Sequence, residues 1–438
     1  MDRRPPVERA LVVHPQRSVK SLRSAQARLE EAVGLARALD LEIVGTEIAP
    51  LRQPNPATLF GKGKAAEIGA LATELEAHVV VVDDALSPIQ QRNLEKAWNT
   101  KVVDRTGLIL EIFARRARTA EGKLQVELAR LEYERSRLVR TWTHLERQRG
   151  GTGGTGGPGE TQIELDRRQI ADRIVKLKRE LVEVRRTRTL HRQARKRTPF
   201  PAIALVGYTN AGKSTLFNRL TGAGALAEDM LFATLDPTVR ALRLPGGRPA
   251  ILSDTVGFIS DLPHELVEAF RATLEEVQEA DVILHVRDIS SADSEAEAQD
   301  VRTVLRELDL EEADPRLIEV WNKLDLVPEE DRPMIETRAA RAGESGGPTA
   351  AALSAVTGEG CDNLFRILAD KVDHAPPVEV LAPPGDGRAV AWLYQHGRVT
   401  ARHDEADGAM RLSVRLDNQA LGQFERLFPE AVLKAAAE

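Results

Sequence analysis

GYTNAGKS, residues 207–214, is the stretch that decides the fold of this 438-residue chain. It follows an apolar run at 202–206, which is typical of a buried strand, and leads into a helical pattern that starts at Thr215. Glycines let successive backbone N–H groups turn around an anion, and the helix N-terminus adds its positive dipole end. In this spacing the lysine reaches the β- and γ-phosphates and the serine ligates Mg²⁺. We therefore predict a nucleotide-phosphate site formed by Gly207, Tyr208, Thr209, Asn210, Ala211, Gly212, Lys213, Ser214 and Thr215.

Three further motifs follow in the order that a GTPase domain requires. Asp254-Thr255-Val256-Gly257 comes after an apolar run, so its carboxylate can hold Mg²⁺ through water and the Gly257 N–H can sense a γ-phosphate. Asn322-Lys323-Leu324-Asp325 ends another run, and the Asp325 carboxylate matches the two N–H donors of guanine. Ser354-Ala355, with Val356 beside them, is placed to offer a backbone N–H to the guanine O6. Together these motifs predict a GTPase domain over residues 199–375, in which Lys213 and Mg²⁺ stabilise charge while water attacks the γ-phosphate of GTP to give GDP.

The chain resembles the HflX family of ribosome-associated GTPases, in the translation-factor-related Obg–HflX group, over nearly its whole length. The resemblance rests on GYTNAGKSTLFN, on LFATLDPT at 231–238, on DTVGFI at 254–259 and on NKLD. Outside the GTPase motifs it rests on DRTGLILEIFARRARTAEGKLQVELA at 104–129 and on GGTGGTGGPGE at 150–160. It implies that Thr234 closes on Mg²⁺ beside Ser214 when GTP is bound. It also implies that the nucleotide site is lined by Phe232, Ala233, Thr234, Leu235 and Asp236.

Phe258 departs from the general GTPase pattern at a chemically important position. Many GTPases have a glutamine directly after D-x-x-G, where it orients the attacking water. A phenyl ring can neither donate a hydrogen bond to that water nor accept one. The substitution is shared by HflX-like proteins and implies slow intrinsic hydrolysis, with the missing element supplied by a partner or a moving loop.

Asn210, the fourth residue of the phosphate loop, has two open interpretations. It resembles the asparagine that some related GTPases use to hold K⁺ near the β- and γ-phosphates. Polar loop residues also commonly satisfy local backbone groups, which is the alternative here. The sequence thus predicts GTP and GDP as substrate and product and Mg²⁺ as cofactor, and leaves K⁺ open.

Length and composition indicate a cytoplasmic protein of about three domains. Hydrophobic residues make up 42% of the chain, which is enough for ordinary cores. The single cysteine, Cys361, excludes an intrachain disulfide framework and fits a reducing compartment. We see no secretory signal and no apolar run of membrane-spanning length, and we expect no DNA partner.

A basic, glycine-interrupted segment separates the GTPase domain from the N-terminal region. Residues 101–200 contain 25 Lys and Arg against 13 Asp and Glu, although the whole chain carries a net charge of −6. Leucines and isoleucines recur in steps of three and four on both sides of GGTGGTGGPG at 150–159, which predicts an antiparallel helical hairpin over 119–198 with the glycines at its tip. A flexible linker is the alternative interpretation. Because glycines allow close backbone approach, we favour a tip that enters a polyanionic site, and the resemblance implies the rRNA of the large ribosomal subunit.

The two ends of the chain predict smaller domains. Residues 1–118 alternate apolar runs at 10–13, 41–48, 79–82 and 101–103 with helical patterns, which indicates an α/β domain with a mainly parallel sheet. Prolines at 376–377 and 383–384 indicate a linker and turn, and 376–438 form a small α+β domain with strand-like runs at 389–394, 399–403 and 410–416 and a helix near 418–428. The predicted fold class is α/β: a P-loop GTPase domain with an N-terminal α/β domain, a helical hairpin and a C-terminal α+β domain.

Three functions remain compatible with the sequence. The first is a Mg²⁺-dependent GTPase that binds the ribosome through its large subunit and splits or rescues stalled or idle ribosomes. The second is a nucleotide-driven RNA remodeller whose N-terminal domain binds ATP independently. The third is a non-ribosomal regulatory switch in which GTP hydrolysis acts as a timer.

Overall fold

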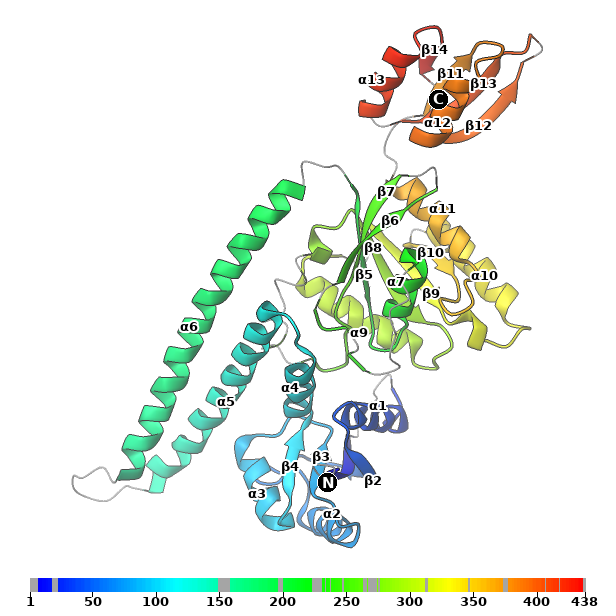
Figure 1. The fold of residues 1–438 in the computed structure, drawn as a ribbon. Coiled ribbons are helices and arrows are strands. Elements are labelled where there is room, and N and C mark those ends of the chain that lie inside the picture. The colour runs from blue at the N-terminus through cyan, green and yellow to red at the C-terminus, as the bar shows by residue number, and fades with distance from the viewer. Residues whose placement is uncertain are drawn as a thin grey trace, which may run out of the picture.

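The structure is a computed structural model that describes most of the chain (Figure 1). The described residues are 7–17, 23–148, 158–195, 200–222 and 231–435, apart from gaps at 233, 237, 246–247, 263–265, 267–273, 275, 312–313, 346, 373–376, 406 and 417. Ala233 and most of the predicted glycine loop at 150–159 lie outside them. No helix among the described residues is long and apolar enough to cross a membrane.

The N-terminal part is a parallel sheet with helices on both faces. Its strands have the order β2-β1-β3-β4, and every pair in it is parallel, as the sequence predicts. The elements are β1 (Arg9–Arg17), α1 (Ala25–Arg37), β2 (Glu42–Leu51), α2 (Lys62–Glu74), β3 (Val79–Val82), α3 (Pro88–Trp98), β4 (Lys101–Asp104) and α4 (Arg105–Arg116).

Local signals explain where these helices begin. The Ser24 side chain accepts from the Ala27 N–H at the start of α1, and Ser87 and Gln90 form a capping box at the start of α3. The Asp104 carboxylate caps α4 by accepting from the Gly107 N–H. No helix was expected at α4, although its buried residues Leu108, Ile109, Ile112 and Phe113 recur with a helical period.

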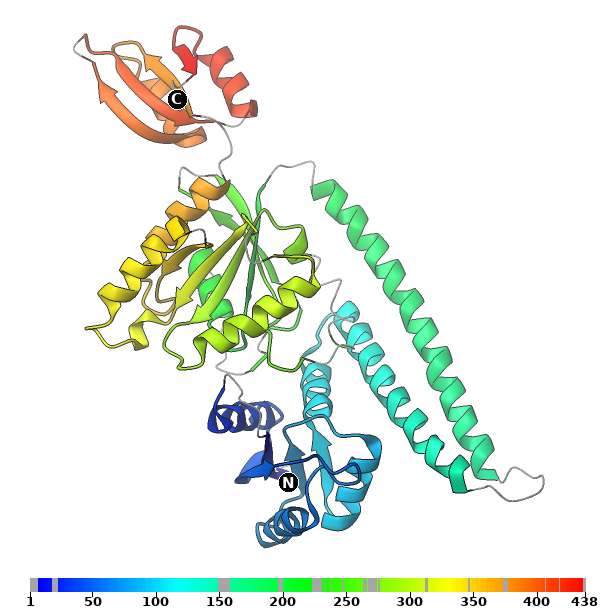
Figure 2. The ribbon, with the colours of Figure 1, turned by 180° about the vertical axis from the view of Figure 1, so that it is seen from behind.

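Helices α5 (Ala120–Gln148) and α6 (Pro158–Arg195) lie side by side in both views of the molecule (Figures 1 and 2). A small cluster of seam residues is buried between them: Leu128, Ile174, Leu177 and Leu181. Ion pairs Arg173–Glu127 and Lys178–Glu132 flank this cluster. These seam positions are among those that the three–four spacing predicts.

The GTPase part contains a six-stranded sheet in the order β10-β9-β8-β5-β7-β6, in which only the edge strand β6 runs antiparallel to its neighbour. Its elements are β5 (Ala202–Gly207), α7 (Lys213–Thr221), β6 (Thr238–Arg243), β7 (Pro249–Asp254), β8 (Val282–Asp288), α9 (Ser294–Glu307), β9 (Leu317–Asn322), η1 (Leu324–Leu326), α10 (Arg332–Arg341), η2 (Ala342–Ser345), β10 (Thr349–Ala352) and α11 (Cys361–Val372). The central strands are buried along almost their whole length, as expected for parallel strands covered on both faces. Consequently β5, β7, β8, β9 and β10 end at one edge of the sheet, which brings the motifs together.

The C-terminal part is an antiparallel sheet in the order β12-β13-β11-β14 with two helices. Its elements are β11 (Pro377–Ala382), α12 (Gly387–His396), β12 (Arg398–Asp404), β13 (Met410–Arg415), α13 (Asn418–Leu427) and β14 (Val432–Ala435). The predicted strand at 389–394 is wrong, because this segment belongs to α12. Its helix begins where the Asp386 carboxylate accepts from the Ala389 N–H, a capping interaction that outweighs the β propensity of the aromatic and branched residues. The predicted linker at 376–377 is also wrong in part, since Pro377 begins β11 on an antiparallel sheet.

The N-terminal and GTPase parts share one hydrophobic core. A single buried cluster contains Leu35 and Ile112 from the N-terminal part together with Leu205, Phe217 and Val286 from the GTPase part. Across this contact the rings of Phe113 and Phe232 meet edge to face, with centroids 4.6 Å apart. The N-terminal part therefore packs against the GTPase part beside the edge of the sheet where the motifs meet.

Candidate nucleotide site

The phosphate loop, residues 207–214, leaves β5 and enters α7 through two glycines that no other residue could replace. Gly207 has φ of +152°, and a Cβ there would lie 2.2 Å from the Val286 carbonyl oxygen. Gly212 has φ of +90°, and its Cβ would lie 2.3 Å from the Asn322 side-chain nitrogen. Both positions combine a left-handed backbone with close neighbours, so the loop shape depends on glycine.

Lys213 is buried in the loop and points back at its carbonyl groups. Its Nζ donates to the Gly207 oxygen at 3.1 Å and to the Tyr208 oxygen at 2.8 Å. Burial lowers the pKa of Lys213 to about 8, and the nearby Asp254 carboxylate only partly opposes this. A buried ammonium held by two carbonyl dipoles is a group that a phosphate would stabilise further.

The three groups predicted to serve Mg²⁺ lie together. Ser214 Oγ donates to Asp254 Oδ2 at 2.8 Å, Thr234 Oγ1 donates to the same oxygen at 2.9 Å, and the two hydroxyls are 2.9 Å apart. The other carboxylate oxygen, Asp254 Oδ1, is buried and has no hydrogen-bond partner in the described part of the chain. Burial raises the pKa of Asp254 and outweighs the effects of Lys213 and the two hydroxyls. Two hydroxyls and an unsatisfied carboxylate oxygen are hard oxygen donors, so these residues fit Mg²⁺, which is bound by few protein groups beside substrate phosphates.

Asn322 connects the phosphate loop to the base-side loop. Its side-chain nitrogen donates to the Ala211 carbonyl at 2.8 Å, and its side-chain oxygen accepts from the Ala355 N–H at 2.9 Å. Lys323, which adopts a left-handed conformation, pairs with Asp288 at 2.8 Å. Leu324 is fully buried. This motif therefore holds two loops in register around the cavity.

Asp325 carries the chemistry expected for guanine. Its Oδ1 atom is buried and has no hydrogen-bond partner among the described residues. An unsatisfied carboxylate oxygen in such a place is costly unless a ligand donates to it. The Asp325 backbone carbonyl accepts from Arg332, which fixes the residue without occupying its carboxylate.

The base-side loop uses its first two N–H groups internally. The Ser354 N–H donates to the Glu359 carbonyl at 2.9 Å, and the Ala355 N–H donates to Asn322. In the structure neither N–H is free for a base oxygen, contrary to the role expected for them. Val356, which follows them, is exposed on the rim of the cavity. Arg219 donates to the Ala355 and Val356 carbonyl oxygens and so holds this loop against α7.

A cavity of about 430 Å³ runs between these groups. The predicted residues that line it are Thr209, Asn210, Gly212, Lys213, Ser214, Thr215, Phe232, Thr234, Thr255, Gly257, Asn322, Lys323, Asp325, Ala355 and Val356. The other described candidates do not line it: Gly207, Tyr208, Ala211, Leu235, Asp236, Asp254, Val256, Leu324 and Ser354. Leu326 also lines the cavity, although it was not among the predicted site residues. Its position directly after Asp325 is the sequence feature that indicates this.

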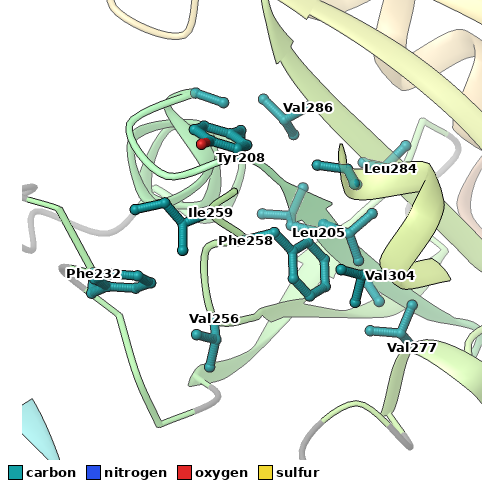
Figure 3. Packing of buried hydrophobic residues seen from close by; sticks show 14 of the residues in the cluster. Leu205, Tyr208, Phe232, Val256, Phe258, Ile259, Val277, Leu284, Val286 and Val304 are labelled. Atoms are coloured by element: carbon teal, nitrogen blue, oxygen red, sulfur yellow. The ribbon is translucent and has the colours of Figure 1, made fainter. Parts of the chain in front are cut away.

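The switch II segment, residues 254–261, lies on the phosphate loop. The Thr209 N–H donates to the Phe258 carbonyl at 2.7 Å, and the Phe258 N–H donates to the Gly207 carbonyl at 3.1 Å. The Phe258 ring is buried in the core beside Leu205 and Val304 (Figure 3). Its side chain thus points away from the cavity and packs as an ordinary apolar residue.

The switch I segment, residues 231–238, is divided between the cavity and the N-terminal part. Thr234 faces the Asp254 carboxylate, whereas Leu235 is buried in the core. Asp236 was expected to line the nucleotide site, but its carboxylate lies at the start of α5. There it accepts from the backbone N–H groups of Arg118 and Thr119 at 2.8 and 2.9 Å, directly before the helix begins at Ala120.

Tyr208 connects the phosphate loop to α1, a role that the sequence did not reveal. Its hydroxyl accepts from Arg23 at 2.7 Å and from the Ser260 N–H at 2.8 Å, and it donates to Glu31. Arg105 donates to Glu31 and to the backbone and side-chain oxygens of Ser260. Burial alone would raise the pKa of Glu31, but Arg105, the Tyr208 hydroxyl and Arg23 outweigh it, so this pKa lies below its ordinary value. Phosphate loop, switch II segment and N-terminal part therefore share one buried polar network.

Comparison with known proteins agrees with this geometry. Four family models match in sequence: GTP-binding GTPase N-terminal at 26–114, GTP-binding GTPase Middle Region at 116–195, 50S ribosome-binding GTPase at 202–323 and HflX C-terminal domain at 339–436. The chain is 50% identical to GTPase HflX of Magnetococcus marinus over 95% of its own length and 94% of that protein. It is 45% identical to GTPase HflX of Escherichia coli over 89% of each chain.

The chain belongs to the HflX family of GTPases. A solved GTP-binding protein from Sulfolobus solfataricus in complex with GDP covers 84% of the chain and 99% of its own, at 24% identity and a TM-score of 0.45, which is too low to add to the assignment. As an HflX-family GTPase the chain binds GTP and hydrolyses it, and the cavity described above is the place in the fold where the family's motifs meet.

Proposed function

We propose that this HflX-family GTPase acts on the ribosome through the large subunit and separates or rescues stalled or idle ribosomes. The proposal rests on one observation in particular. Hydrogen bonds from Arg118 and Thr119 to Asp236 connect the nucleotide site to the basic α5–α6 helix pair. One of the matching family models is described as a 50S ribosome-binding GTPase, which supports the same partner. Basic residues exceed acidic ones by 13 to 3 over residues 167–197, as expected for a polyanionic surface.

In the proposed reaction cycle Ser214 and Thr234 ligate Mg²⁺, and Asp254 holds it through water. When bound, the ion neutralises charge on the β- and γ-phosphates. Lys213 leaves its two carbonyl partners to contact the phosphates, and Gly257 offers its N–H to the γ-phosphate. Asp325 pairs with the two guanine donors, and the N–H of Val356, on the rim of the cavity, donates to the guanine O6.

We further propose that intrinsic hydrolysis is slow and partner-stimulated. The Phe258 ring is packed in the core and has no polar atom, so it cannot orient the attacking water. Binding to a large subunit would change the contacts that hold the switch II segment on the phosphate loop.

Cosedimentation with purified ribosomal subunits tests the partner. We expect the chain to pellet with large subunits in the presence of a non-hydrolysable GTP analogue and Mg²⁺, and to be released with GDP. An Arg-to-Ala series at exposed positions of α6, Arg167, Arg168 and Arg186, should weaken binding and make it less dependent on salt, because fewer phosphate contacts release fewer counterions. Absence of binding in every nucleotide state would favour the non-ribosomal regulatory switch.

A cavity in the N-terminal part keeps an ATP-binding RNA remodeller as a second candidate. The cavity, of about 980 Å³, lies where β1, β2 and β3 end and is lined by His14, Arg17, Arg52, Asp83 and Thr106 among others. Open α/β sheets bind ligands at the carboxyl ends of their strands. Binding of ATP to the full chain, with the guanine site saturated by GDP, tests this function, and failure of excess ATP to bind would remove it.

A further inference from the structure

We propose that Arg37 of the N-terminal part is an arginine finger for GTP hydrolysis, supplied within the same chain. The proposal deepens the proposed function and rests on its Mg²⁺-dependent hydrolysis but not on its ribosomal partner. An arginine finger stabilises the charge that develops on the transferred phosphoryl group, and some GTPases carry one in their own chain.

A second cavity, of about 480 Å³, lies between α1 and the phosphate loop. Thr209 and Asn210 line both this cavity and the nucleotide cavity, so the two are separated by one stretch of the phosphate loop. Leu231 of the switch I segment and Arg37 also line the second cavity. A side chain that reaches from the second cavity past Thr209 and Asn210 enters the nucleotide cavity near the positions expected for the β- and γ-phosphates.

Helix α1 is fixed against the GTPase part by contacts one and two turns before Arg37. A Cβ at Gly34 would lie 3.0 Å from the Leu231 side chain, so glycine allows the helix to approach the switch I segment closely. Glu31 pairs with Arg23 and accepts from the Tyr208 hydroxyl. Residues 31, 34 and 38 lie on one helix face, and Arg37 is beside them at the last turn. The backbone of Arg37 is therefore held close to the phosphate loop while its side chain remains exposed.

The guanidinium of Arg37 is available. It forms no hydrogen bond or ion pair with any residue that the structure describes, and it is not needed to hold α1 in place. By contrast, Arg23 in the same cavity is held by Tyr208, Glu31 and Asp300, so moving it would break the buried network.

The second cavity is lined by acidic groups and by one buried hydroxyl. Glu30, Asp293 and Glu297 give it a negative charge, although Arg37 forms an ion pair with none of them in the structure. On the inner wall the Thr209 hydroxyl oxygen is buried and has no hydrogen-bond partner within the described residues. A guanidinium donating to it would be aimed across the phosphate loop. Phosphate oxygens accept from arginine in bidentate geometry and compete well with single carboxylates.

Arg37 would also supply a catalytic group that Phe258 cannot provide. A ring packed in the core contributes no polar group, so positive charge has to reach the γ-phosphate from another element. Arg37 supplies that charge from α1, whose position depends on the contact between the N-terminal and GTPase parts. A partner that tightens this contact would then raise the rate of hydrolysis.

The test is single-turnover hydrolysis of GTP by the full chain without ribosomal subunits, in KCl with Mg²⁺. Arg37→Ala and Arg37→Gln are compared with Arg92→Ala, which removes an exposed arginine from α3 of the same part of the chain. We expect both Arg37 variants to lose at least about 100-fold in rate, within the range attributed to arginine fingers, with GTP and GDP affinities within threefold of wild type. Binding of GDP with aluminium fluoride, which mimics the transferred phosphoryl group, should be lost in both variants and kept in Arg92→Ala.

Rates within threefold of wild type in a folded Arg37→Gln variant would overturn the proposal, as would an equal loss of GDP binding. Thermal melting of each variant establishes folding, and the exposed position of Arg37 makes both substitutions tolerable for α1. Absence of hydrolysis by the wild-type chain itself would instead refute the proposed function, so the two failures are distinguishable.

Discussion

Asp236 accepts hydrogen bonds from both the backbone N–H and the side-chain hydroxyl of Thr119, the residue directly before α5, so the switch I segment is hydrogen-bonded to the start of this helix. Two residues earlier, the Thr234 hydroxyl contacts the Asp254 carboxylate. A movement of the switch I segment toward Mg²⁺ therefore reaches the α5–α6 helix pair through a single side chain. This contact links the nucleotide state to the base of the basic helices.

The first prediction removes these hydrogen bonds. Asp236→Ala should lower the free energy of unfolding by about 1–2 kcal/mol, the order expected for loss of hydrogen bonds to a charged group. In the wild-type chain a GTP analogue should increase hydrogen-exchange protection of the amides at 118–123, and in the variant this increase should disappear. Hydrogen exchange followed by mass spectrometry measures both.

Asp40→Ala is the matched control for this experiment. Its carboxylate pairs with Arg115 at 3.3 Å on the surface, where such a pair contributes little to stability. Nucleotide-dependent protection that persists in Asp236→Ala would show that the switch I segment and α5 are coupled by another route.

The second prediction follows from the lowered pKa of Lys213, which burial shifts from 10.5 to about 8. Because the folded-state pKa is the lower one, the unfolded chain binds more protons between pH 8 and 10.5. Stability of the nucleotide-free chain should therefore rise with pH across this window, and the penalty is fully present below pH 8. The shift corresponds to about 3 kcal/mol.

Binding of GDP should restore the charge of Lys213. Near pH 8.5 we expect uptake of about 0.5–0.8 proton per GDP bound, since the phosphates raise the lysine pKa again. Calorimetry in buffers of different ionisation enthalpy measures this uptake. Mg²⁺ is omitted so that proton release from Asp254 on metal binding does not contribute to the measured heat. A Lys213→Met variant should show no such uptake, and a wild-type value near zero would mean that Lys213 is already charged in the free chain.

The third prediction concerns the base. Asp325→Asn replaces an unsatisfied carboxylate oxygen by an amide that cannot accept from both guanine donors. GTP affinity should fall at least about tenfold, consistent with loss of hydrogen bonds to a charged group, and xanthosine triphosphate should bind better than to wild type. Competition binding measures the ratio, with Asp331→Asn in the following loop as the control. An unchanged preference for GTP would remove Asp325 from base recognition.

Much of the GTPase sheet was predictable because parallel strands buried on both faces are encoded by short continuous apolar runs in the sequence. The runs at 202–206, 250–252 and 317–321, and all but the last residue of the run at 350–353, belong to strands of one sheet. Since their carboxyl ends meet at one edge, motifs far apart in sequence were expected to converge there. Gly212 beside Asn322 is the closest example of this convergence.

Contacts between separate parts of the chain were not predictable in the same way. Tyr208 belongs to the phosphate-loop motif, but the motif does not indicate where its side chain lies, and its partners Arg23, Glu31 and Ser260 come from other segments. Asp236 belongs to a motif that suggests nucleotide contact, yet its carboxylate serves a helix more than a hundred residues earlier in the chain. In the C-terminal part, a single cap at Asp386 decided that an apolar segment became a helix.

The fourth prediction concerns the glycine segment, which lies outside the described residues. If its glycines permit close approach to rRNA, replacing Gly153, Gly154, Gly156 and Gly157 by alanine should impair ribosome-linked activity, because alanine adds a Cβ and disfavours left-handed backbone. Basal GTP hydrolysis should remain near wild type. Subunit separation followed by light scattering, beside hydrolysis without ribosomes, measures the two activities. Equal loss of both would indicate a linker that positions the GTPase part.

The last prediction concerns Asn210 and monovalent cations. Asn210 adopts a left-handed backbone with φ of 60°, is exposed and lines both cavities at the phosphate loop. Its side chain forms no hydrogen bond within the described part of the chain, so the structure gives no local partner that would account for an amide there. A K⁺ ion held by this amide would add positive charge beside the β- and γ-phosphates, where Phe258 contributes none.

We expect steady-state hydrolysis to be several-fold faster in K⁺ than in Na⁺ at equal ionic strength, and large subunits to raise turnover by about tenfold or more in either salt. Asn210→Ala should abolish the difference between the salts while leaving stimulation by subunits. Identical wild-type rates in K⁺ and Na⁺, with and without subunits, would discard the cation role of Asn210, whereas absence of stimulation by subunits would contradict the ribosomal partner.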